Sequence, residues 1–178
     1  MTWLKRTAIV GLSVVGVVFV HLATNAVLPA PWNQVNMVFV FLIFFLLFEE
    51  SGTVVWIAFS VHFFIELYAV SPFGILLFSG TISTLLSFWL YQYFFTNQSW
   101  YTAAALSLLA IVIYRSIYTA LFLFFHVFGY FALPPWSALL LVYGWEMLLT
   151  SGVTGLAYLL TTRPFHKKRK LLPVEWRV

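Results

Sequence analysis

The chain has 178 residues, of which 63% are hydrophobic and only 8% are charged, and its formal net charge is +4. A soluble domain has about 25% charged residues, so this chain has too few polar side chains to cover a water-exposed surface. The composition therefore excludes a soluble globular protein. It predicts an all-α, polytopic integral membrane protein whose exterior contacts lipid.

The residue types that are missing limit the chemistry. The sequence contains no cysteine, which excludes disulfides, thiolate catalysis and thiolate metal sites. It also contains no aspartate, which excludes intramembrane aspartyl protease chemistry. Neither a GxSxG nucleophile motif nor a glycine-rich phosphate loop occurs. We therefore expect neither enzymatic activity nor a cofactor.

Six apolar segments follow one another along the chain, and a helix needs about 20 apolar residues to cross a bilayer. We expect helices over residues 7–28, 35–48, 53–70, 75–95, 100–128 and 136–162, followed by a basic tail over 163–178. The connecting stretches are short, so residues 1–178 form a single transmembrane domain. The first segment resembles a signal peptide, but its length and the later segments predict a retained helix.

The basic residues lie at the two ends of the chain. Lys5 and Arg6 precede the first segment and only Arg115 lies between segments one and six. The others follow the last segment: Arg163, Lys167, Lys168, Arg169, Lys170 and Arg177. This placement suits anionic lipid rather than nucleic acid. We expect the run from Lys167 to Lys170 to contact lipid headgroups, or alternatively a cytoplasmic partner.

The number of segments sets the topology. Six crossings put both termini on one side, and the positive-inside bias places that side in the cytoplasm. Segment 35–48 is short for a complete crossing. If it were re-entrant, the count would be five and the termini would lie on opposite sides, whereas local thinning of the bilayer could accommodate it as a span.

Three charged residues lie deep in the predicted spans: Glu66, Arg115 and Glu146. A charge in the hydrocarbon layer costs at least about 2.5–3.5 kcal/mol, so such residues usually pair or face a cavity. At a rise of about 1.5 Å per residue, all three lie within about one helical turn of one level, in the outer half of the membrane. We expect Arg115 to pair with Glu66, Glu146 or both. A buried ion pair that fixes helix packing is favoured over a proton or ligand site.

Histidines also occur within the predicted spans, at His21, His62 and His126. No metal-binding spacing such as HExxH is present, so we expect no metal site. His62 and Glu66 are four residues apart and share one helical face, which predicts a local contact between them.

One block of the sequence carries a family resemblance. It contains the acidic Glu66, then the turn Ser71-Pro72-Phe73-Gly74, then an apolar helix that ends between Tyr91 and Asn97. This block resembles the bacterial rod shape-determining membrane protein MreD family, in which an acidic residue, usually Asp, and an S-P-x-G turn join two helices. The short second segment, which follows Asn36, the long fifth segment and the basic C-terminus also fit.

The resemblance implies a function and partners. MreD-like proteins are non-enzymatic membrane scaffolds of the bacterial cell-elongation machinery, in the inner membrane. They bind an MreC-like bitopic protein and, directly or indirectly, the actin-like filament protein and the peptidoglycan synthases. Their fold is similar to that of the substrate-binding subunits of energy-coupling-factor vitamin transporters. Such a subunit is the alternative function, although the first segment lacks the Ala-xxx-Ala spacing typical of those subunits.

Overall fold

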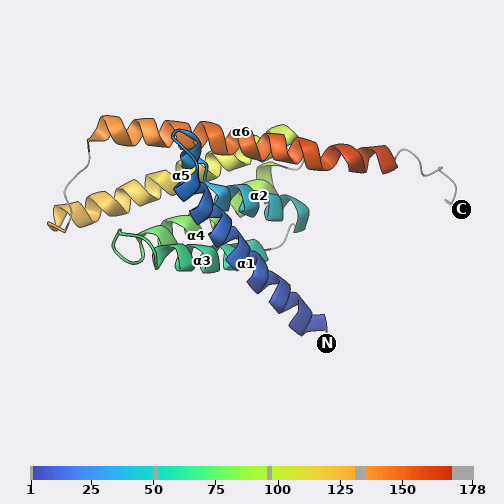
Figure 1. Cartoon of the computed structure of the whole chain (residues 1–178), viewed down its shortest axis with the longest axis horizontal. Helices are drawn as coiled ribbons and strands as arrows, with labels where there is room; N and C mark the ends of the chain where they lie inside the picture. Colours follow the sequence, from blue (N-terminus) through green and yellow to red (C-terminus); the bar gives the residue numbers. More distant parts are fainter. Residues whose placement is uncertain (1, 50–51, 96–97, 131–134, 170–178) are drawn as a thin grey trace, which may run out of the picture.

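The chain folds into helices in the computed structural model (Figure 1). The structure describes residues 2–49, 52–95, 98–130 and 135–169, with side chains for residues 10–162 of these. The elements are α1 (Thr2–Val27), the short 3-10 helix η1 (Trp32–Gln34), α2 (Met37–Glu49), α3 (Thr53–Glu66), α4 (Ile75–Phe94), α5 (Trp100–Val127) and α6 (Trp136–Arg169). The predicted all-α class is confirmed for this described part of the chain.

Four of these helices, α1, α4, α5 and α6, are long and apolar enough to cross a membrane. Large apolar side chains point outward from them, such as Phe19, which is 71% exposed, and Leu148, which is 68% exposed. Outward apolar side chains on helices of this length are typical of a protein surrounded by lipid. α1 runs obliquely across the other helices (Figure 1).

The helices α2 and α3 are shorter than a standard span, with 13 and 14 residues. Each is about 20 Å long, against a hydrocarbon layer of about 30 Å. The prediction that the third segment continues to Val70 is wrong, because α3 ends at Glu66. Pro72 disfavours helical backbone in the residue before it, and Gly74 turns the chain with a φ of 104°.

Although α2 is short, it forms much of the core. It contacts α1, α3, α5 and α6. Its side chains are buried on several sides, including Phe39, Ile43, Leu46 and Leu47. A helix that is apolar all round is buried inside a protein or in lipid, and here the neighbouring helices cover it.

The helix α5 packs between α4 and α6, and small residues bring these helices close together. The Ser83 hydroxyl on α4 donates a hydrogen bond to the Ala110 carbonyl on α5, at 2.5 Å. On the other side, a Cβ added at Gly155 of α6 would lie 3.1 Å from the Cβ of Ala104. Small residues at such crossings allow close backbone approach in membrane proteins.

The last helix is longer than predicted. Residues 163–169, which were expected to belong to a tail, continue α6 up to Arg169. Lys and Arg favour helices, so the change from apolar to basic residues does not end this one. Lys167, Lys168 and Arg169 therefore lie on α6, but their side chains and all of Lys170 are outside the described residues.

Candidate functional site

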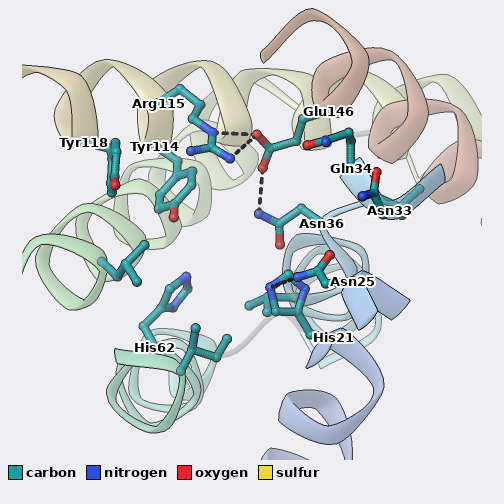
Figure 2. Close-up of a pocket in the computed structure, with 14 residues that line it drawn as sticks. His21, Asn25, Asn33, Gln34, Asn36, His62, Tyr114, Arg115, Tyr118 and Glu146 are labelled. Carbon is teal, nitrogen blue, oxygen red and sulfur yellow. Dashed lines mark hydrogen bonds and ion pairs between the residues drawn. The ribbon is translucent and has the colours of Figure 1, made fainter. Parts of the chain in front are cut away.

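A polar cavity of about 380 Å³ lies among the helices (Figure 2). Most of its lining residues carry hydrogen-bonding groups. These polar residues are His21, Asn25, Asn33, Gln34, Asn36, His62, Tyr114, Arg115, Tyr118 and Glu146. They come from α1, from η1 and the residues next to it, and from α3, α5 and α6. A concave site with convergent polar groups is where a membrane protein with an apolar exterior would hold a ligand.

Arg115 of α5 and Glu146 of α6 form an ion pair at this cavity (Figure 2). The Arg115 Nε and Nη2 atoms both lie 2.5 Å from Glu146 Oε2. The Arg115 side chain is 20% exposed and the Glu146 side chain is 3% exposed. Of the two partners that the sequence proposed for Arg115, the structure therefore supplies Glu146.

Asn36 extends this pair to a third element. Its side-chain Nδ2 donates to Glu146 Oε1 at 2.9 Å, and its backbone N–H donates to the Thr150 hydroxyl at 2.9 Å. Both bonds tie the start of α2 to α6. Sequence reasoning did not assign Asn36 a role in the site, although a polar residue immediately before an apolar run was a usable signal.

Aromatic rings surround the guanidinium. The Arg115 Cζ atom lies 4.6 Å from the ring centre of Tyr143, 5.1 Å from that of Tyr114 and 5.7 Å from that of Tyr118. A cation over aromatic faces gains attraction from the ring quadrupoles, more so where water is excluded. The rings therefore help to hold this charge in an apolar setting.

Glu66 does not join this network. Its two carboxylate oxygens accept hydrogen bonds from the backbone N–H groups of Leu76, at 3.3 Å, and Leu77, at 2.5 Å. These groups lie in the first turn of α4, where free N–H groups and the helix dipole favour a negative charge. The third deep charge is thus stabilised by a helix N-terminus rather than by Arg115.

The turn between Glu66 and α4 contains the other motif residues. Gly74 has a φ of 104°, a conformation that glycine adopts without steric cost. Ser71 and Pro72 precede it, and the Ser71 hydroxyl is buried without a hydrogen-bond partner among the described residues. Glu66, Ser71, Pro72 and Gly74 therefore belong to one α3–α4 corner.

His62 faces the cavity from α3 (Figure 2). Its Nδ1 donates to the Ala58 carbonyl at 2.8 Å, which leaves Nε2 as an acceptor. Within the described residues it makes no hydrogen bond to Glu66, so the structure does not form the contact that their spacing predicted. The ring instead lies directly against Gly80 of α4, where any Cβ would collide with it.

The other two histidines of the predicted spans, His21 and His126, do not share a site. His21 lines the cavity, and its Nε2 lies 3.2 Å from Asn25 Nδ2. His126 lies in the last turn of α5. Among the described residues, no group of three or more His, Asp and Glu side chains is placed to hold a metal ion.

Comparison of the chain with models of protein families, with curated proteins and with solved structures finds no match. We therefore infer the function from the residues of the cavity and of the α3–α4 corner.

Proposed function

We propose that this chain is a non-enzymatic membrane scaffold of the bacterial cell-elongation machinery, of the MreD type. The observation that carries the proposal is the α3–α4 corner. The residues that give the sequence its family resemblance, Glu66 and the turn ending at Gly74, act together as one structural unit. Glu66 holds the start of α4, and Gly74 provides the backbone conformation that lets α4 begin there.

The proposed setting is the bacterial inner membrane, with six crossings and both termini in the cytoplasm. The four long helices account for four crossings. α2 and α3 supply the other two, and local thinning of the bilayer accommodates their length. The family resemblance implies a six-helix unit similar to the substrate-binding subunits of energy-coupling-factor transporters.

The proposed direct partner is an MreC-like bitopic protein, which binds by lateral packing of its transmembrane helix. An apolar groove between α5 and α6 supports this mode of binding. It is lined by Trp100, Ala104, Ser151, Gly152 and Gly155, among others, and Gly152 has open space beside it. Small residues on a lipid-facing groove allow a second helix to approach closely. The actin-like filament protein and the peptidoglycan synthases join through the wider complex.

Co-purification in nanodiscs with an MreC-like bitopic protein tests the proposal. The wild-type chain should retain the partner, whereas Gly152→Leu should lose it because the new side chain fills the groove. Gly11→Leu on α1 is the matched control, since Gly11 also has open space beside it. Failure of the wild-type chain to retain the partner contradicts the scaffold proposal, and equal retention by Gly152→Leu contradicts the groove.

A second function, the substrate-binding subunit of an energy-coupling-factor vitamin transporter, is favoured by one observation. That observation is the polar cavity, because a scaffold needs no ligand pocket. Recovery of an ATPase module and of a bound vitamin with the purified chain, in place of an MreC-like protein, supports this second function.

A further inference from the structure

The charges of the cavity cancel each other. Among its lining residues, Arg115 is the only Lys or Arg and Glu146 is the only acidic residue, and they are paired at 2.5 Å. Glu146 also accepts from Asn36, so both of its oxygens are engaged. A ligand with a net charge would meet no unpaired opposite charge here, and burying it would be costly. The cavity therefore suits an uncharged molecule.

Several polar groups of the lining have no partner of their own. The hydroxyls of Tyr114 and Tyr118 and the side-chain amide of Gln34 make no hydrogen bond to any described residue. The buried Oδ1 of Asn33 is also unpaired among the described residues. The Tyr114 residue is 5% exposed. Of these atoms, Asn33 Oδ1 is fully buried, and a buried polar atom normally has a partner. The set therefore offers donors and acceptors to a molecule that enters the cavity.

The ring faces of the two cavity tyrosines, in contrast, already contact other side chains. The ring of Tyr114 contacts Phe39, with ring centres 5.2 Å apart, and the Arg115 guanidinium also lies over it. The ring of Tyr118 stacks with Phe122 at 6.3 Å and also carries the guanidinium. The two tyrosines thus present their hydroxyl groups to a ligand, rather than ring faces that are open to stacking. This favours a ligand that makes many hydrogen bonds over a flat heteroaromatic ring that needs stacking.

We propose that the cavity binds an uncharged, polyhydroxylated molecule of about the size of a monosaccharide. A volume of about 380 Å³ corresponds to roughly a dozen waters, which is enough for one such ring. The molecule is either a free sugar or polyol, or the headgroup of a glycolipid. The inference does not depend on the scaffold proposal, because it concerns only the cavity, and a failed partner capture would leave it standing.

Titration calorimetry on the full chain tests the inference. The chain is placed in phosphatidylcholine nanodiscs and never exposed to a sugar-headed detergent, which would compete. The free probes are methyl glucoside and myo-inositol, and glucuronate is the charged counterpart. Monoglucosyl diacylglycerol built into the nanodisc, followed by native mass spectrometry, is the lipid probe. Saturable binding of a neutral probe, with glucuronate bound about tenfold more weakly or not at all, is the expected result.

The variants Tyr114→Phe and Tyr118→Phe remove only hydroxyls without partners, so both should fold. Together they should weaken binding by about tenfold. The variant Gln34→Leu tests a second position of the cavity lining, because it removes the side-chain amide. Tyr93→Phe is the matched control, because Tyr93 is 76% exposed and lies outside the cavity.

Binding of the free probes points to a free ligand, and retention of the glycolipid alone points to a lipid headgroup. Absence of binding by every neutral probe overturns the inference and leaves the cavity as a water-filled space. Binding that is unchanged in both Tyr→Phe variants and in Gln34→Leu also overturns it.

Discussion

The guanidinium of Arg115 and the carboxylate of Glu146 meet across α5 and α6, with Nη2 and Oε2 2.5 Å apart. The pair joins the two longest helices at a point where neither charge can be fully hydrated. Asn36 adds the start of α2 to the same carboxylate. Breaking a buried pair leaves the other charge uncompensated, which costs more than the pair itself contributes.

The first prediction concerns this pair. Arg115→Met and Glu146→Gln should each lower the free energy of unfolding by about 3–5 kcal/mol, because each leaves one buried group without its counterion. The double variant Arg115→Met/Glu146→Gln should lose less than the sum of the two. Thermal unfolding of the purified chain in one fixed detergent measures the three changes. Glu49→Gln is the control, because Glu49 is exposed at the end of α2. Additive losses in the double variant would show that the two residues are not coupled.

The second prediction concerns Glu66. Glu66→Gln keeps the shape of the side chain but removes its charge from the N-terminus of α4, so it should cost about 1–2 kcal/mol. The loss should be local, and the amides of Leu76 and Leu77 should exchange with deuterium about tenfold faster. Hydrogen exchange followed by mass spectrometry resolves this segment. Ser71→Ala in the same corner should have little effect, because its hydroxyl has no partner among the described residues. Unchanged exchange at Leu76 and Leu77 would refute the capping role.

The third prediction concerns the contact between His62 and Gly80. Gly80→Ala should destabilise the chain by about 1–3 kcal/mol, because the new Cβ would collide with the imidazole ring. His62→Ala removes the ring, so the double variant should recover part of that loss. The unfolding midpoint in detergent is the measurement. Gly16→Ala on α1 should be neutral or slightly stabilising, since no atom lies within 4 Å of the added Cβ. A neutral Gly80→Ala would mean that α3 and α4 are not in close contact there.

The fourth prediction concerns the topology. Because the natural sequence has no cysteine, single cysteines can be labelled without background. With six crossings and a cytoplasmic N-terminus, Val70→Cys and Tyr130→Cys should react with an impermeant maleimide added outside intact cells. Thr53→Cys should react only after the membrane is opened. Labelling of Thr53→Cys from outside, with Val70→Cys protected, would show that α2 does not cross the membrane.

Much of the fold follows from local patterns in the sequence. Long apolar runs in a chain with few charges require helices in lipid, because any other backbone would leave polar groups unpaired. The start of α4 at Ile75 and that of α5 at Trp100 agree with the predictions, since turn residues precede each helix. The predicted end of α3 at Val70 was wrong, because the apolar residues after Glu66 continue the pattern of a helix that has already stopped.

The sequence alone also showed that three deep charges needed partners, because an isolated charge in lipid is too costly. Only the tertiary structure decided which partners they took. Arg115 could be satisfied by either acidic residue, and helix packing placed Glu146 beside it while the corner turned Glu66 toward the backbone of α4. No local sequence pattern predicts the cavity either, because its lining comes from residues as far apart as His21 and Glu146. Such a site exists only once the helices have packed.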